Sequence, residues 1–178
     1  MHAWIYRLFF RLLNNLIVVP AFRIGLGRIV SNPVTGRVMV LILKGRRTGR
    51  TRYTPVGYAI MNGRIYCYRG ERSQGAWYLN LLAEPHLEIM LPDGRIRGHA
   101  EEVSDDDDRF TALRQILKNG GLSGLIYGFN PWTVEEGVLR ERMRGVTVIR
   151  ITPEISSSSQ QALRSSGVVS AERPHENS

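Results

Sequence analysis

The chain has 178 residues, of which 43% are hydrophobic and 22% are charged, enough for one domain with a buried core and too few residues for two. A net charge of +8 and an isoelectric point near 10.2 favour an acidic partner, which is nucleic acid, an anionic membrane surface or an anionic cofactor. A single cysteine, Cys67, excludes an internal disulfide, and no cysteine or histidine cluster has metal-ligand spacing. We therefore expect no bound metal and a location in the reducing cytoplasm.

Residues 1–19 are rich in large apolar side chains and superficially resemble a membrane span. Arg7 and Arg11 interrupt the apolar run, which is too short to cross a bilayer, and the order of charge and apolar core is not that of a secretory signal. The arginines share one side of a helix, so we predict an amphipathic helix that ends near Pro20. Two interpretations remain: packing on its own domain, which is the commoner use of such a helix, or lying at the inner face of a membrane as a peripheral anchor.

Beyond Val38 the sequence is typical of short strands joined by hairpin turns. The first predicted strand is the apolar run Val38–Leu43, and the second is Tyr53–Ile60. Asn62-Gly63 separates the second strand from a third that begins near Ile65, and both turn residues tolerate positive φ. We therefore expect the second and third strands to be antiparallel neighbours.

A short helix and a further hairpin follow. Ala76–Ala83 has apolar residues at helical spacing, and Pro85 comes soon enough to end a helix there. His86–Leu91 and Ile96–Val103 are predicted strands, joined by the turn sequence Pro92-Asp93-Gly94.

An acidic helix start comes next. Ser104 precedes Asp105–Asp108, so the serine is predicted to cap the helix while the carboxylates lie at the positive end of its dipole. We therefore interpret the aspartates as structural rather than as metal ligands or acid–base catalysts. This helix is expected to reach Gly120, and a loop over 120–131, a polar helical stretch over 133–144 and a last strand over 146–151 complete the predicted elements.

Several short antiparallel strands with few helices predict a mainly β fold with peripheral helices (α+β), built as a small closed or partly closed β-barrel. We expect the barrel domain to span residues 34–154, after an N-terminal amphipathic helical segment over 1–33. Residues 155–178 are rich in serine and poor in large apolar side chains, so this tail is predicted to be disordered.

Lys44–Arg52, with the sequence KGRRTGRTR, carries five cationic side chains directly after the first predicted strand. Gly45 and Gly49 allow the backbone to turn and to approach a ligand closely, and arginine supplies paired donors for phosphate or carboxylate. The glycine spacing is not that of a P-loop or of a dinucleotide fingerprint. Spacing alone therefore leaves two alternatives, an anion-binding loop and a solvated basic turn.

The order of these motifs resembles the deazaflavin-dependent nitroreductase family. The matching elements, within about 41–103, are GRRTGRTR followed by Tyr53-Thr54-Pro55-Val56, then Arg69-Gly70, and then Ala76-Trp77-Tyr78-Leu79-Asn80-Leu81 before Pro85. The resemblance implies a split β-barrel of the flavin- and deazaflavin-binding type. It also implies an oxidoreductase that uses coenzyme F420, a deazaflavin, and transfers a hydride to a quinone-like, nitro or other small hydrophobic acceptor. The coenzyme is an elongated anion, which suits a cationic loop.

The resemblance also implies a set of site residues. Those expected to bind the cofactor are Arg46, Arg47, Thr48, Gly49, Arg52, Thr54, Pro55, Arg69, Gly70, Trp77 and Asn80. The residues up to Arg52 would hold the phosphate and the acidic tail, and the others would lie around the ring system. Trp77 is equally typical of a core position, whereas Asn80 needs a polar partner if it is buried among its leucine neighbours. No catalytic residue is assigned, because the cofactor carries the reactive carbon; Tyr127 is a weak candidate for contact with the acceptor.

The sequence departs from the family pattern where the acceptor would bind. The loop between Gly70 and Trp77 is short and lacks a double glycine, and Val138 stands where quinone- and nitro-reducing members have a tyrosine. A third departure is the glycine-rich stretch 118–131, so the identity of the acceptor stays open.

The alternative function is a split barrel that uses flavin mononucleotide (FMN), or one that binds a hydrophobic ligand without catalysis. A nucleic-acid partner is not expected, because the basic residues are not interleaved with exposed aromatics along a groove. Two further candidate partners are a membrane surface, through residues 1–19, and a second copy of the chain in a homodimer.

Overall fold

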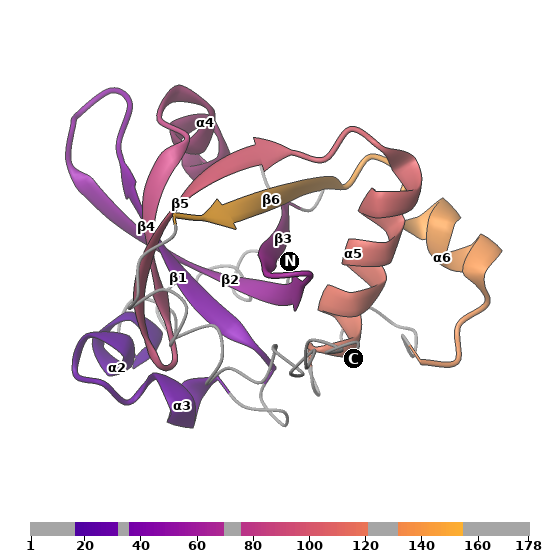
Figure 1. Cartoon of the computed structure of the whole chain (residues 1–178), viewed down its shortest axis with the longest axis horizontal. Coiled ribbons are helices and arrows are strands. Elements are labelled where there is room, and N and C mark those ends of the chain that lie inside the picture. Colours follow the sequence, from indigo (N-terminus) through magenta and orange to yellow (C-terminus); the bar gives the residue numbers. More distant parts are fainter. Residues whose placement is uncertain (1–16, 32–35, 70–75, 121–131, 155–178) are drawn as a thin grey trace, which may run out of the picture.

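The computed structural model describes residues 17–31, 36–69, 76–120 and 132–154. Within these ranges the strands close into one antiparallel barrel with the order β1-β2-β3-β6-β5-β4 (Figure 1). The strands are β1 (Val38–Lys44), β2 (Thr51–Met61), β3 (Arg64–Arg69), β4 (His86–Leu91), β5 (Gly94–Glu102) and β6 (Thr147–Pro153). The predicted mainly β barrel is therefore confirmed. The predictions for residues 1–16 and 155–178 lie outside the described residues.

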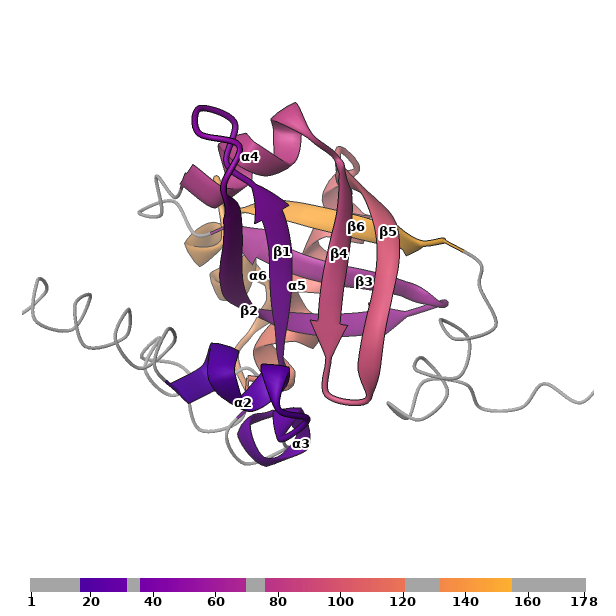
Figure 2. The same ribbon diagram turned by 90° about the vertical axis from the view of Figure 1, so that its left-hand side faces the viewer.

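The helices lie around the barrel rather than inside it. They are α2 (Val19–Arg23), α3 (Gly27–Val30), α4 (Ala76–Ala83), α5 (Asp106–Lys118) and α6 (Glu136–Arg142). Figure 2 shows α4 at one end of the barrel and α2 with α3 at the other. In the described part of the chain, no helix combines the length and the apolar character needed to cross a bilayer.

The barrel interior is filled by every second residue of each strand, as the two-residue period of a β-strand requires. On β1 these residues are Met39, Leu41 and Leu43, each at most 3% exposed. Val40, on the other face of β1, is also fully buried, because it packs with Phe22 of α2. Burial on both faces explains why β1 is a continuous apolar run instead of an alternating one.

The Asn62-Gly63 turn forms as predicted. Asn62 has φ of 50° and Gly63 has φ of 70°, so both turn residues have positive φ, and Met61 pairs with Arg64 across the hairpin. Positive φ at both turn positions matches the twist of the two strands, which is why an Asn-Gly pair is favoured here.

The structure corrects two predicted helix boundaries. Helical backbone continues past the predicted end near Pro20 to Arg23, because Pro20 lies in the first turn of α2, where a missing N–H costs no hydrogen bond. Ser104 does not cap α5: the side chain of Asp105 accepts from the N–H groups of Asp107 and Asp108, at 3.1 and 2.8 Å. Asp105 takes the role because it is the last residue with extended backbone before the helix.

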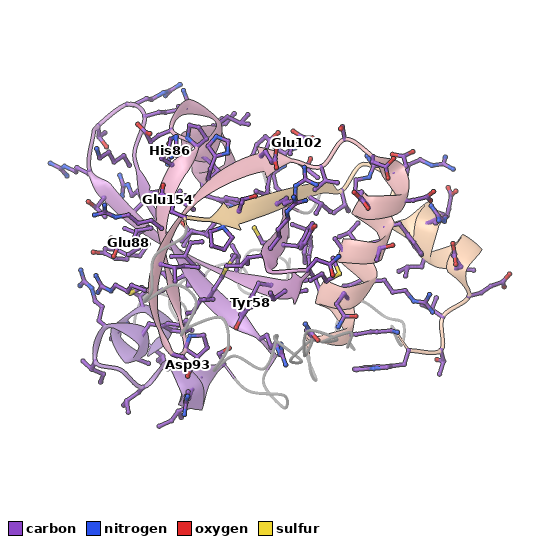
Figure 3. The ribbon with its side chains drawn as sticks, in the orientation of Figure 1. Tyr58, His86, Glu88, Asp93, Glu102 and Glu154 are labelled. Carbon is purple, nitrogen blue, oxygen red and sulfur yellow. The ribbon has the colours of Figure 1, made fainter. Side chains whose placement is uncertain are left out.

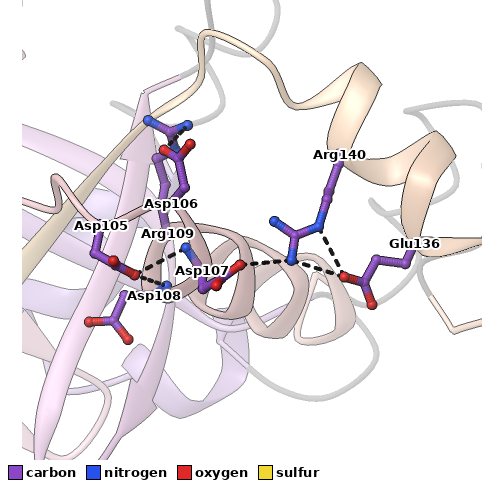
Figure 4. Close-up of polar contacts among 7 residues, drawn as sticks. All are labelled: Asp105, Asp106, Asp107, Asp108, Arg109, Glu136 and Arg140. Carbon is purple, nitrogen blue, oxygen red and sulfur yellow. Dashed lines mark hydrogen bonds and ion pairs between the residues drawn. The ribbon is translucent and has the colours of Figure 1, made fainter.

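Two aspartates of the acidic run form ion pairs. Asp106 pairs with Arg109 at 2.7 Å, and Asp107 pairs with Arg140 of α6 at 2.9 Å (Figure 4). These contacts join the start of α5 to its own first turn and to α6.

Candidate functional site

The cationic loop forms a tight turn between β1 and β2. The N–H of Gly45 donates to the carbonyl oxygen of Arg50 at 2.9 Å, and the N–H groups of Thr48 and Gly49 donate back to the carbonyl oxygen of Gly45 at 3.1 and 2.7 Å. Gly49 has φ of 64°, a conformation that favours glycine. The two glycines therefore shape the turn, and the amide of Gly49 is already engaged within it.

The positive charge of this loop has no carboxylate partner in the described structure. Arg46, Arg47, Arg50 and Arg52 are exposed, and none forms an ion pair with another described residue. Elsewhere in the described ranges, carboxylates are bound by Arg28, Arg95, Arg109, Arg140, Arg144 and Arg150. Uncompensated guanidinium groups on a fixed turn are suited to hold an anion.

Helix α4 fixes the position of this turn. Asn80 is 7% exposed, and its Oδ1 accepts a hydrogen bond of 3.1 Å from the N–H of Arg46. The predicted need of Asn80 for a polar partner is thus met by the loop backbone. Figure 1 and Figure 2 show the loop and α4 side by side at the same end of the barrel.

The same helix contacts Arg69 on its other side. Arg69 is the last residue of β3, and its guanidinium carbon lies 4.4 Å from the ring centroid of Tyr78. The hydroxyl of Tyr78 donates to Oε2 of Glu102, the last residue of β5, at 2.6 Å. Figure 3 shows Glu102 at the end of β5 that leads to α5. α4 thus links the cationic loop to Arg69.

Tyr78 is neutral at physiological pH, and its surroundings extend this state to higher pH. The hydrogen bond to Glu102 and burial of the phenol raise the pKa of Tyr78, while the nearby Arg69 cation lowers it by a smaller amount. Tyr78 therefore stays a neutral hydrogen-bond donor at physiological pH.

Two further predicted residues lie on the barrel wall. Thr54 and Pro55 are half-buried on β2, opposite Leu41 and Val40 of β1. In the described pairings this part of β2 has β1 as its neighbour while β3 pairs only from Tyr58 onward, so Pro55 stands where a strand tolerates a missing N–H.

Trp77 is half-buried against the interior core of the barrel, and its ring meets that of Tyr78 edge-on at 6.3 Å. These contacts support the interpretation of Trp77 as a core residue. Gly70 and Tyr127 lie outside the described residues. Val138 is exposed on α6, which packs on α5 through Leu139.

Sequence reasoning missed Tyr78 and Glu102. Tyr78 stands inside the motif that carries the family resemblance, and this position was the available signal. Glu102 gave no signal, because it meets Tyr78 only through the closure of the barrel, 24 residues along the chain.

Comparison with solved structures agrees with the observed fold. A conserved hypothetical protein from Mycobacterium tuberculosis has a TM-score of 0.50 and 17% identity, over 68% of this chain and 75% of that one. A candidate 5-nitroimidazole antibiotic resistance protein from Bacteroides thetaiotaomicron has a TM-score of 0.49 and 14% identity, over 67% and 74%. An F420-H2 dependent reductase, FDR-A, has a TM-score of 0.43 and 15% identity, over 64% and 92%. Of these, the likeness to the Mycobacterium tuberculosis protein concerns the fold.

The search of curated proteins gave no match. The family model of the F420H2-dependent quinone reductases matches residues 18–121, which is more than half of the chain. That range includes the cationic loop, Arg69 and all of α4. The chain therefore belongs to the F420H2-dependent quinone reductase family, whose members are reductases that use coenzyme F420.

Proposed function

We propose that the α4 end of the barrel holds coenzyme F420 and that the protein transfers a hydride from the reduced cofactor to a quinone-like, nitro or other small hydrophobic acceptor. The observation that carries this proposal is the cationic turn Gly45–Arg50, which has no ion-pair partner among the described residues and is anchored to buried Asn80.

The residues present fit an anionic cofactor in two respects. A Cβ atom on Gly45 would lie 2.9 Å from Oγ1 of Thr48 and 3.2 Å from the carbonyl oxygen of Arg50, so the turn is tight enough to require glycine. The buried Nε of Arg69 has no hydrogen-bond partner among the described residues. A buried guanidinium donor without a partner is costly, and a ligand oxygen would satisfy it.

Each part of the site has a distinct role in this proposal. Arg46, Arg47 and Arg52 bind the phosphate and the acidic tail by charge-assisted hydrogen bonds. Oγ1 of Thr48 accepts weakly from the N–H of Arg50 at 3.4 Å, which leaves its O–H proton to donate to a phosphate oxygen.

The barrel wall and α4 position the ring system of the cofactor. Thr54 and Pro55 flank it, Trp77 closes the apolar side, and Arg69 meets a ring oxygen. Coenzyme F420 supplies the hydride when it is bound, and the protein contributes orientation and exclusion of water.

Fluorescence titration of the purified protein with F420 and, separately, with FMN tests the proposed cofactor. We expect saturable binding of F420 and weaker binding of FMN. Tight FMN binding without F420 binding would favour the flavin alternative, and binding of neither would refute the proposal.

Substitution of the loop arginines tests their assignment. Arg47→Ala and Arg52→Ala should each weaken F420 binding by about 1–3 kcal/mol, the worth of a charge-assisted contact. Arg97→Ala removes an exposed arginine on β5 and should leave the affinity unchanged, so it controls for net charge. Unchanged affinity in both loop variants would make the loop a solvated turn.

Turnover identifies the acceptor class. Reduced F420 is mixed with the protein and a menaquinone analogue or a nitroaromatic, and its reoxidation is followed by absorbance. Reoxidation by the quinone alone would assign a quinone reductase. If F420 binds and neither acceptor reoxidises it, both acceptor classes are wrong for this chain.

A further inference from the structure

Arg69, Tyr78 and Glu102 come from three separate elements and meet at the α4 end of the barrel. Tyr78 lies between the other two: its ring face contacts the Arg69 guanidinium at 4.4 Å, and its hydroxyl donates to Glu102 at 2.6 Å. Tyr78 is 9% exposed, whereas Arg69 is half-buried and Glu102 is exposed, so the Tyr78–Glu102 hydrogen bond is partly buried. We call these residues the Arg69 support.

Within the Arg69 support, Tyr78 connects Glu102 to Arg69. The Tyr78–Glu102 hydrogen bond holds the hydroxyl end of the Tyr78 side chain at the end of β5, while its backbone is held by helix α4. The ring then presents its face to Arg69, and a cation stacked on an aromatic face loses freedom to turn. Glu102 thus constrains Arg69 through Tyr78.

The constrained guanidinium still has capacity to bind. Among the described side chains only Arg69 and Arg114 have a buried Nε without a hydrogen-bond partner. Arg114 lies in the middle of α5, whereas Arg69 ends a barrel strand and is stacked on the helix that also anchors the cationic loop. Of the two, Arg69 is the one whose guanidinium stacks on the Tyr78 ring.

We propose that Tyr78 and Glu102 are positioning residues that hold the Arg69 guanidinium ready to donate to an oxygen of the cofactor ring. The inference rests on the proposed function, since the ligand is coenzyme F420. It assigns Tyr78 and Glu102 no contact with the cofactor, so their effect on binding passes entirely through Arg69.

A double-mutant cycle tests this dependence. F420 affinity is measured by fluorescence titration for the wild type, Tyr78→Phe, Arg69→Met and the double variant. Tyr78→Phe keeps the ring and removes only the hydroxyl that Glu102 accepts from. We expect Arg69→Met to weaken binding by about tenfold, as for one charge-assisted contact, and Tyr78→Phe to weaken it by severalfold. In the Arg69→Met background, Tyr78→Phe should have no further effect.

Two more variants separate positioning from general stability. Glu102→Gln retains an acceptor oxygen for the Tyr78 hydroxyl and should recover most of the affinity that Glu102→Ala loses. Tyr66→Phe removes the hydroxyl of another buried tyrosine, on the α5-covered face of β3, and should leave the affinity unchanged. Thermal unfolding of each variant confirms that it is folded.

The outcomes separate this inference from the proposed function. If the wild type binds F420 and the effects of Tyr78→Phe and Arg69→Met multiply in the double variant, Tyr78 acts independently of Arg69 and the inference is overturned while the function stands. If the wild type fails to bind F420, the proposed function fails and this inference fails with it.

Discussion

The N–H of Arg46 donates a hydrogen bond of 3.1 Å to Oδ1 of Asn80, and this contact joins the turn of the first hairpin to a helix 34 residues later. Asn80 is buried at 7% exposure among apolar neighbours, so its amide has little access to water. The helix that closes the end of the barrel thereby also determines where the cationic turn stands. Stability of the helix and affinity for an anion at the turn are coupled through this contact.

Replacement of Asn80 by alanine should therefore affect both properties. Asn80→Ala leaves the Arg46 N–H without its acceptor, which should lower the free energy of unfolding by about 1–3 kcal/mol. F420 affinity should fall as well, because the turn is no longer preorganised. Urea unfolding and fluorescence titration measure the two effects. Leu79→Ala, at a position 42% exposed on the same helix, is the matched control and should change neither by much.

Glycine is required at position 45 by space rather than by backbone conformation. Gly45→Ala would press its Cβ against Oγ1 of Thr48 and the carbonyl oxygen of Arg50, at 2.9 and 3.2 Å. The second of these atoms accepts the hydrogen bond that closes the turn, so we expect a loss of about 1–3 kcal/mol in unfolding free energy together with weaker F420 binding. Gly137→Ala places a methyl where no atom lies within 4 Å, in helix α6, and should stabilise by up to about 1 kcal/mol. Equal effects of the two substitutions would contradict this account of the turn.

The cap of α5 is assigned differently by sequence and structure, so it can be tested directly. Asp105→Ala should destabilise the protein by about 0.5–2 kcal/mol, because two helical N–H groups lose their acceptor. Ser104→Ala removes a side chain with no role as a cap and should be nearly neutral. Thermal unfolding of the two variants decides between them, and the reverse ranking would restore Ser104 as the cap.

Much of the fold could be predicted from local sequence. The Asn62-Gly63 turn, helix α4 at Ala76–Ala83 and strand β4 at His86–Leu91 formed at the predicted positions, since each is specified by residues within a few positions of one another. The errors at Pro20 and Ser104 are one-turn and one-residue shifts. The first arose because proline usually ends a helix but is also tolerated in a first turn. The second arose because serine and aspartate are both good N-caps and stand next to each other here.

The candidate site could be predicted only in part. The cationic loop and Asn80 are visible in the sequence because their chemistry is unusual for their surroundings. The Tyr78–Glu102 pair is not visible, because a tyrosine on a helix and a glutamate at a strand end are ordinary in sequence. Only closure of the barrel through β6 brings the ends of β3 and β5 close together.

Burial of the Cys67 thiol should make the free energy of unfolding depend on pH in the alkaline range. It is fully buried in the barrel interior, and burial raises the pKa of the Cys67 thiol from 9.0 to about 12. In the unfolded chain the thiol ionises near its ordinary value, so the folded state binds the proton more tightly. The contribution is complete below pH 9 and is lost as the pH rises toward 12, at roughly 1 kcal/mol per pH unit.

Urea unfolding of the wild type and Cys67→Ala between pH 8 and about 11 measures this contribution. The unfolding free energy of the wild type should fall relative to that of the variant as the pH rises, because only the wild type has the buried thiol. Every other titrating group, including the buried phenol of Tyr58, is common to both proteins and cancels in the difference. A thiol reagent at pH 8 should label the wild type only after urea is added. A difference that stays constant with pH, or rapid labelling of the folded protein, would mean that the barrel interior admits water at Cys67 and that the thiol is not held neutral by burial.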